Sequence, residues 1–372
     1  MLDSPVIQKS MSKKSVLLLG GTGAIGVYLQ AECLGQGYMV YVTTRSEQQS
    51  VTPNLHYIIG NAKNCDFLKQ TITSRSYSVI VDFMVYTTRE FNERVDLLLG
   101  SNSHYIFVST YRVFSTVEEC PITETTPFLL DVIIDEEYLA TDEYALAKAR
   151  QERILRNRKR NNWSIVRPSI TYSTNRFQLG TLEANVILSR ASNCLPVPIP
   201  TEVINKKTTM TWAGDVAKMI ERLMLNENAY REDFNVLTNE SISWREVADI
   251  YKNAVNLEVK EVSLERFQKL RGNIWQLKYD RMIARVCSND KILAATELKQ
   301  EMLMPVRKGI FLELNNNKKQ SIKLSTINRT QGRVDRVLNI IQWPFRASIR
   351  ESISYIFGRV ALLDLILLTF KR

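Results

Sequence analysis

Short apolar segments alternate with longer segments of helical spacing through the first half of the chain. The apolar segments are three to six residues long, and the spacing predicts strands at 16–19, 38–43, 57–59, 79–83, 105–109 and 164–167. Helices are expected between them, at 24–36, 66–74, 89–99 and 142–157. Short apolar strands that alternate with helices favour a parallel sheet covered on both faces. The pattern therefore predicts an α/β fold with a doubly wound sheet.

The pattern loosens after residue 168. The Pro-rich stretch 195–200 is expected to form an extended connection, followed by a helix at 214–225, a strand at 234–237 and helices at 244–254 and 264–270. We therefore expect the chain to leave the sheet and return once. The predicted domains are 12–170 with 207–238 for the sheet, 171–206 with 239–304 for a smaller discontinuous domain, and 305–372 for a C-terminal extension.

A glycine-rich turn joins the first predicted strand to the first predicted helix. It reads Gly20-Gly21-Thr22-Gly23-Ala24-Ile25-Gly26. Glycine permits a tight turn and a close approach to a pyrophosphate, and the helix N-terminus supplies free N–H groups. In this strand–turn–helix context the turn predicts a dinucleotide-binding Rossmann fold. The alternative is a glycine turn that binds nothing.

The second predicted strand ends near Arg45, where sheets that bind NAD commonly carry an acidic residue. A guanidinium fits the 2′-phosphate of NADP, so NADP is slightly favoured over NAD. The alternative is a solvated surface arginine.

Three polar side chains are candidates for proton transfer. Tyr144 and Lys148 lie four residues apart in a predicted helix, so both are expected on one side. An adjacent ammonium is expected to lower the pKa of the tyrosine from near 10 and make it a general acid or base. Thr110 follows a strand at the edge where open α/β sheets bind ligands, and its hydroxyl could orient the reacting oxygen. The alternatives are a solvated helix face and a turn hydroxyl.

Composition narrows the class of protein. The 372 residues are 45% apolar and 24% charged, which excludes a disordered or collagenous chain. Two histidines and five scattered cysteines argue against zinc or Ser-His-Asp chemistry, and we expect the cysteines to be reduced and mostly buried. Reduced cysteines indicate a cytoplasmic location, and the inner face of a membrane is the alternative within it. No signal peptide is visible.

The net charge of +10 is unevenly distributed. Residues 305–372 carry 13 Lys and Arg against 4 Asp and Glu, whereas residues 1–304 carry 36 against 35. A nearly neutral main body is not what nucleic-acid binding requires.

Five ordered motifs give the sequence a family resemblance. They are the glycine turn, Ser109-Thr110-Tyr111-Arg112-Val113-Phe114, the Tyr144/Lys148 pair, Arg167-Pro168 and Thr211-Trp212-Ala213-Gly214-Asp215-Val216-Ala217. The chain resembles the extended short-chain dehydrogenases/reductases of the nucleotide-sugar epimerase/dehydratase group over about residues 14–300. Asp82-Phe83, Phe234-Asn235-Val236 and Ile242-Ser243-Trp244 are most similar to the divergent branch that includes the chloroplast stem-loop-binding proteins.

The resemblance implies roles for these residues. Tyr144 becomes the general acid/base, Lys148 its activator and a ribose ligand, and Thr110 the hydroxyl that orients substrate. The cofactor-binding residues become Gly20, Thr22, Gly23, Ala24, Ile25, Gly26, Arg45, Asn61 and Lys148. Asn61 replaces the aspartate that many relatives use for adenine. Tyr111-Arg112 replaces the Asp-Glu pair of the 4,6-dehydratases, so dehydration is disfavoured.

The expected reaction is epimerisation at, or reduction of, a sugar carbon of a nucleotide-sugar with NADP or NAD. The alternatives are a non-catalytic cofactor-binding or RNA-binding relative, and a reductase of another small carbonyl compound. The substrate pocket is expected around Tyr86, 171–195 and 206–211, where Lys206 or Lys207 either meets a diphosphate or is solvated. A homodimer is a further expectation.

The C-terminal segment 329–372 mixes arginines with apolar residues and ends in an apolar run broken by Asp364. That run is too short to span a membrane, which takes about 20 residues. Three interpretations stay open: a helix packed on its own domain or on a second subunit, an interfacial helix on anionic lipid, and a nucleic-acid contact.

Overall fold

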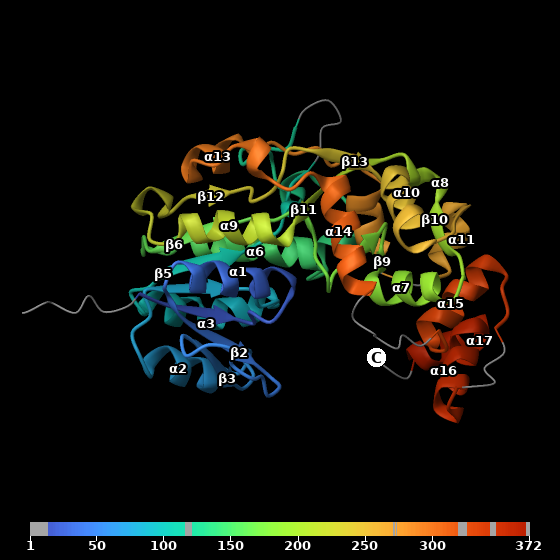
Figure 1. Cartoon of the computed structure of the whole chain (residues 1–372), viewed down its shortest axis with the longest axis horizontal. Helices are drawn as coiled ribbons and strands as arrows, with labels where there is room; N and C mark the ends of the chain where they lie inside the picture. Colours follow the sequence, from blue (N-terminus) through green and yellow to red (C-terminus); the bar gives the residue numbers. More distant parts are fainter. Residues whose placement is uncertain are drawn as a thin grey trace, which may run out of the picture.

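The computed structural model describes residues 14–115, 121–270, 272, 274–318, 326–342 and 347–369. Its centre is a seven-stranded parallel sheet in the order β12-β6-β5-β4-β1-β2-β3 (Figure 1). The strands are β1 (Ser15–Leu19), β2 (Met39–Thr44), β3 (Leu55–Ile59), β4 (Val79–Asp82), β5 (His104–Val108), β6 (Trp163–Val166) and β12 (Asp233–Phe234). The strand order reverses direction at β1, where open α/β sheets form a ligand crevice. The predicted α/β fold with a doubly wound Rossmann sheet is confirmed.

Alternate residues of each strand enter two different cores, which explains the continuous apolar runs in the sequence. Val16 and Leu18 of β1 pack with α1 (Ala24–Gly35) and α9 (Ala213–Leu223) on one face. Leu17 and Leu19 pack with α2 (Cys65–Thr73), α3 (Thr88–Gly100) and α6 (Tyr144–Arg156) on the other. Both faces of the sheet are therefore covered, as parallel strands require.

The chain leaves the sheet after β6 and returns at β12, as predicted. Short connecting elements lie within or beside the sheet region: η1 (Tyr111–Val113), α4 (Leu129–Val132), α5 (Glu136–Leu139) and η2 (Glu227–Ala229).

The second region has its own core. Its strands are β7 (Ile170–Tyr172), β8 (Gln178–Leu179), β9 (Leu182–Glu183), β10 (Val197–Pro200), β11 (Lys207–Trp212), β13 (Ser241–Ser243) and β14 (Val259–Val262). The helices here, and those that lead on to the C-terminal segment, are α7 (Ala184–Ser192), α8 (Thr201–Ile204), α10 (Trp244–Val255), α11 (Leu264–Gln268), α12 (Ile274–Gln276), η3 (Leu277–Arg281), α13 (Asp290–Thr296) and η4 (Gln300–Met302).

The Pro-rich stretch is extended, as expected, and its last four residues also form a strand, β10, that pairs in parallel with β14. In a two-stranded sheet each strand is an edge and tolerates the missing N–H of Pro198. The expectation for the cysteines needs correction. Only Cys33 and Cys287 are buried, whereas Cys65 and Cys194 are exposed; all four are free thiols, and Cys120 lies outside the described residues.

Four helices follow residue 305: α14 (Val306–Lys318), α15 (Arg329–Leu338), α16 (Ile349–Arg359) and α17 (Ala361–Thr369). Val306, Ile310 and Leu314 of α14, with Val334 and Val337 of α15, are buried in the core of the second region. Helices α14 and α15 therefore pack on their own chain, while α16 and α17 lie outside that core at the lower right of Figure 1. The predicted domain boundary at residue 305 stays a prediction.

Candidate active site

The glycine turn adopts the geometry that a diphosphate requires. Gly20 has a φ of +69°, which favours glycine, and a Cβ on Gly26 would lie 2.2 Å from the carbonyl oxygen of Gly21. Helix α1 therefore packs directly on the turn. At Gly23, the N-cap of α1, an added Cβ would meet no atom within 4 Å, and no side chain caps the helix. The turn thus leaves open space beside unpaired N–H groups, which fits a phosphate.

A cleft of about 380 Å³ connects this turn with the ends of β5 and α6. Gly20, Gly23, Ala24, Ile25 and Gly26 line one side of it. The remaining lining residues are Phe83, Val85, Val108, Ser109, Thr110, Tyr111, Arg112, Tyr144, Pro168, Ser169, Ile170, Thr171, Arg176, Gln178, Glu183, Gln276 and Arg281. The cleft therefore brings the glycine turn, Thr110 and Tyr144 into one space.

Thr110 and Tyr144 meet inside the cleft. Thr110 follows β5, and its hydroxyl accepts a hydrogen bond from the Arg112 N–H at 3.3 Å. The same hydroxyl is close enough to the Tyr144 phenol to lower its pKa, although burial outweighs this effect. Tyr144 is the first residue of α6 and stays partly exposed to the cleft. The Thr110 hydroxyl can therefore stabilise the turn and also face the cleft, so the two interpretations of this residue do not exclude each other.

The expected effect of Lys148 on Tyr144 is not what the structure shows. Burial raises the pKa of Tyr144 from 10.0, and this outweighs the lowering by the cations of Arg112 and Arg176. The guanidinium of Arg112 lies 5.6 Å from the centre of the Tyr144 ring. The phenol is therefore protonated at neutral pH, and the cations that face it come from two arginines.

Lys148 is buried and does not belong to the described residues that line the cleft. Its ammonium donates to the carbonyl oxygens of Val108 at 2.8 Å and Met84 at 3.2 Å, at the ends of β5 and β4. Burial lowers its pKa to about 8, although Asp82 acts in the opposite direction. Because an ammonium has three N–H groups, one remains for a ligand.

Arg112 ties Thr110 to Tyr144. Its guanidinium pairs with Glu143 at 2.7 Å, and Glu143 caps the helix that Tyr144 begins. It also lies 3.5 Å from Asp280 of η3. Burial opposes the charge, but Asp280 and Glu143 outweigh burial and raise the pKa of Arg112. The sequence analysis named Arg112 in the strand-end motif and as a departure from the dehydratase pattern, without a role of its own. In the structure its guanidinium connects the segment after β5 with the start of α6.

A second buried network explains the Arg167-Pro168 motif. Arg167 pairs with Glu152 of α6 at 2.6 Å and with Asp233 of β12 at 2.5 Å. The Ser109 hydroxyl donates to the same Glu152 at 2.6 Å. These groups fix α6 against the ends of β5 and β6, so they hold Thr110 and Tyr144 in register.

Four predicted cofactor residues lie outside the cleft lining among the described residues: Lys148, Thr22, Arg45 and Asn61. Lys148 is buried, whereas the other three are exposed, Arg45 directly after β2 and Asn61 shortly after β3. Their predicted contacts with the adenosine end stay predictions. Lys206, Lys207 and Tyr86 do not line the cleft either.

Four cleft residues lie within the segment 171–195 that was expected to form the substrate pocket, although none of them was singled out: Thr171, Arg176, Gln178 and Glu183. Gln276 and Arg281 were not expected there, because they come from short elements without a periodic pattern. The Arg281 guanidinium is occupied by Asp280, Gly180 and Gln178. Arg176 is exposed, and within the described chain no ion pair engages it.

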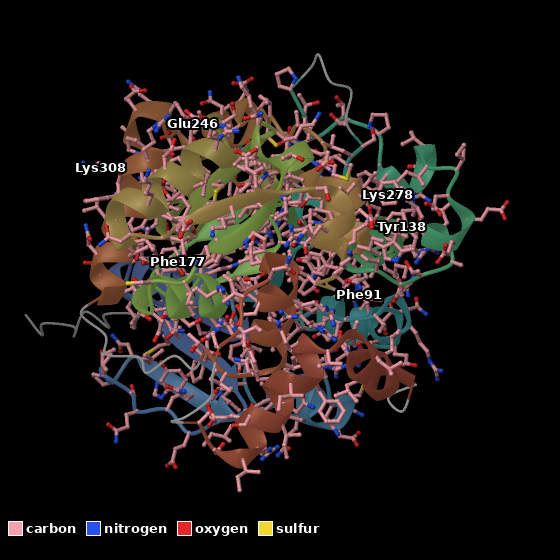
Figure 2. All side chains as sticks on the ribbon, turned by 90° about the vertical axis from the view of Figure 1, so that its right-hand side faces the viewer. Phe91, Tyr138, Phe177, Glu246, Lys278 and Lys308 are labelled. Atoms are coloured by element: carbon pink, nitrogen blue, oxygen red, sulfur yellow. The ribbon has the colours of Figure 1, made fainter. Side chains whose placement is uncertain are left out.

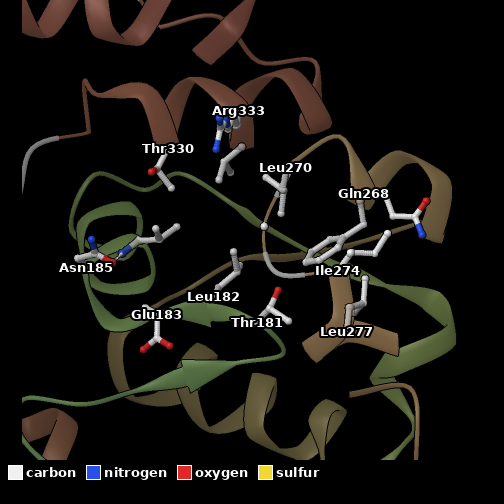
Figure 3. Close-up of a pocket in the computed structure, with 14 residues that line it drawn as sticks. Thr181, Leu182, Glu183, Asn185, Gln268, Leu270, Ile274, Leu277, Thr330 and Arg333 are labelled. Carbon is white, nitrogen blue, oxygen red and sulfur yellow. Dashed lines mark hydrogen bonds between the residues drawn. The ribbon is translucent and has the colours of Figure 1, made fainter. Parts of the chain in front are cut away.

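A second cavity of about 640 Å³ adjoins the cleft, since Glu183 lines both (Figure 3). Its wall is mainly apolar and includes Leu182, Leu270 and Leu277. Thr330, Arg333 and Val334 of α15 line one side. Figure 3 shows Thr330 and Arg333 in its upper half. The C-terminal segment therefore contributes to the surroundings of the site.

Comparison with known proteins agrees with this architecture. No family model matches the chain. A curated protein, the chloroplast stem-loop binding protein of 41 kDa b from Arabidopsis thaliana, is 24% identical over 245 residues. The match covers 60% of this chain and 59% of that protein, which is less than two thirds of its length. It agrees with the resemblance to the divergent branch.

Solved structures extend the likeness to most of the chain. Pal from Bacillus thuringiensis superposes with a TM-score of 0.66 at 16% identity, covering 82% of this chain and 99% of that one. The dTDP-glucose 4,6-dehydratase of Bacillus anthracis, solved with NAD, gives 0.64 at 16% identity, covering 83% and 97%. The UDP-glucose 4-epimerase of Thermus thermophilus, solved with NAD, gives 0.62 at 18% identity, covering 82% and 99%. The chain therefore has the fold of the extended short-chain dehydrogenases/reductases.

Proposed function

We propose that this protein is an NAD(P)-dependent oxidoreductase or epimerase that acts on a sugar carbon of a nucleotide-sugar. One observation carries the proposal: Thr110 and Tyr144 share a cleft with the open side of the glycine turn. The solved relatives bound to NAD share this fold, and two of them act on nucleotide-sugars.

The glycine turn would hold the diphosphate of the cofactor. Open space at Gly23 and the uncapped start of α1 supply N–H donors for it. Lys148 is the proposed ligand of the nicotinamide ribose, and reaching it requires the ammonium to move from the carbonyls of Val108 and Met84 towards the cleft. When bound, the nicotinamide supplies the hydride acceptor or donor. Arg45 and Asn61 are the proposed contacts at the adenosine end, and NADP is slightly favoured by Arg45.

Tyr144 would move the proton. Because its pKa is raised, its phenol can donate a proton to a sugar carbonyl at neutral pH, while Thr110 accepts or donates a hydrogen bond at the same oxygen. In the oxidising direction the phenol must first lose its proton, and the nearby cations of Arg112 and Arg176 stabilise the phenolate. Reduction of the substrate can therefore start from the protonated phenol, whereas oxidation first requires the phenol to lose its proton.

The remainder of the substrate would extend towards the second region. Arg176 is an exposed cation in the cleft and is suited to a diphosphate. The adjoining cavity beyond Glu183 is large and apolar enough for a nucleobase.

A second candidate is a cofactor-binding or RNA-binding protein without turnover, which the match to a stem-loop binding protein favours. The nearly neutral residues 1–304 argue against RNA as the ligand of the main body. A reductase of another small carbonyl compound is the third.

The direct experiment is to denature the purified protein and identify released small molecules by mass spectrometry. A released nicotinamide dinucleotide together with a nucleotide-sugar supports the proposal, and retained oxidised cofactor favours epimerisation. Salt-sensitive RNA binding without either molecule would favour the second candidate.

A further inference from the structure

The outer face of α16 and α17 is apolar and exposed. Ile349, Ile353 and Ile356 follow each other at intervals of four and three residues, which places them on one side of α16, and Val360 follows at the C-cap of this helix. Their exposed fractions are 80%, 51%, 46% and 43%. Leu362 and Leu365 of α17 add to the set of exposed apolar residues, at 67% and 48%. We call these six residues the apolar face.

The orientation of this face is fixed by the opposite side of α16. The Tyr355 hydroxyl donates to Asp335 of α15 at 2.7 Å. At Gly358, an added Cβ would lie 2.0 Å from the carbonyl oxygen of Arg329, so the two helices touch through their backbones. A capping box of Ser348 and Glu351 begins the helix. The packing of α16 on α15 therefore holds the apolar face outward. Figure 2 views the molecule from the right-hand side of Figure 1, where α16 and α17 lie.

The acidic residues near the face are already engaged. Asp364 is fully buried and pairs with Arg329, Arg333 and Arg336 at 2.9, 2.8 and 3.1 Å. Asp335 pairs with Arg190 at 2.8 Å. Three guanidinium groups around one carboxylate give this cluster a net positive charge.

The whole segment is basic as a result. Residues 326–369 hold six arginines against three acidic residues, and Arg350 is exposed next to Ile349. Exposed aliphatic side chains and excess positive charge therefore occur together on the C-terminal helices.

We propose that the apolar face docks on an anionic membrane surface. Aliphatic side chains gain from contact with acyl chains, and arginines gain from anionic headgroups. A second copy of the chain would bring two basic segments together across a symmetric contact, which like charges oppose. A nucleic acid could pair with the arginines, but its phosphates would give the exposed isoleucines no apolar contact. Within the described residues no helix is long and apolar enough to cross a membrane, so the contact would be peripheral.

The test is sedimentation of the full chain with vesicles of phosphatidylcholine containing about 30% phosphatidylserine, against pure phosphatidylcholine. The wild type should sediment with the anionic vesicles only, and less as salt rises. The variant I349E/I353E should lose at least about tenfold in vesicle affinity. Arg350→Gln should lose about fivefold.

The matched control is V51E/I134E, which changes two residues that are 86% and 93% exposed outside this face. It should bind vesicles like the wild type. Failure of the wild type to sediment, or equal binding by I349E/I353E, would overturn the proposal. So would a dimer or an RNA complex that I349E/I353E abolishes in the absence of vesicle binding. Cofactor affinity, measured on the same variants, tests the proposed function separately.

Discussion

Arg112 offers the sharpest test of how the site is held together. Its guanidinium pairs with Glu143 at 2.7 Å and lies 3.5 Å from Asp280, with both carboxylates almost completely buried. Arg112→Met keeps the length of the side chain and removes its charge. In this variant Glu143 still accepts a hydrogen bond from the Tyr138 hydroxyl, and Asp280 still forms its ion pair with Arg281.

The loss of stability follows from these partners. Removing one member of a buried ion pair costs about 3–5 kcal/mol, and the remaining partners favour the lower limit. We expect a loss of about 3 kcal/mol in the free energy of unfolding and a fall of about 5 °C in Tm. The variant keeps the backbone N–H that binds Thr110, but it loses the guanidinium that holds Glu143 at the start of α6 and one of the two cations that face Tyr144. We therefore expect kcat to fall about 100-fold. The Kd of the cofactor should stay within about twofold, since Arg112 does not touch the glycine turn.

Calorimetry, titration of the cofactor and turnover measure these three quantities. Arg153→Met is the matched control, because Arg153 lies on α6, the helix that Tyr144 begins, and pairs with Asp131 at an exposed site. That variant should change stability by less than about 1 kcal/mol and leave kcat unchanged. If Arg112→Met keeps full turnover, or loses cofactor affinity and turnover equally, the positioning role is refuted.

Three further predictions concern the cofactor turn and a buried carboxyl. Gly23→Ala should leave Tm unchanged and raise the cofactor Kd about tenfold, because the new methyl meets only open space in the protein. Gly26→Ala should lower Tm, because its methyl collides with the carbonyl of Gly21. Equal effects of the two variants on Tm in calorimetry and on Kd in titration would contradict this. Burial raises the pKa of Asp215 from 3.8 to about 6, so the native state binds more protons than the unfolded state between these values and stability falls as pH rises through them. Asp215→Asn should therefore raise stability by about 2 kcal/mol at pH 8 and have little effect at pH 4, as denaturant titration at both values would show. Arg45→Asp should weaken NADP more than NAD in binding titrations, and equal loss would exclude a 2′-phosphate contact.

The sheet and the glycine turn could be predicted because local pattern decides them. The strands β1, β2, β4 and β5 are buried on both faces of the sheet, so each is a short run of apolar residues. Such a run predicts a strand even when the strands that pair with it are not known. The Gly20 and Gly26 positions follow from backbone constraints that only glycine meets.

The interior of the site could not be predicted because distant segments make it. Four-residue spacing suggested that Lys148 acts on Tyr144, but the long lysine side chain is drawn to the carbonyl of Val108. The cations facing Tyr144 come from the loop after β5 and from the turn at Arg176. The pairing of Asp364 with three arginines likewise joins residues about 30 positions apart and has no local signal.

The central claim is that Tyr144 transfers a proton beside a cofactor bound at the glycine turn. Wild type and Tyr144→Phe should be incubated with NAD, NADP or their reduced forms and a panel of UDP-, dTDP- and GDP-linked sugars, with product detected by mass spectrometry and cofactor affinity measured in parallel. Tyr230→Phe, which alters a phenol outside the cleft lining, is the control. The account predicts turnover in the wild type and the control, none in Tyr144→Phe, and equal cofactor affinity in all three. Undiminished turnover by Tyr144→Phe would contradict it.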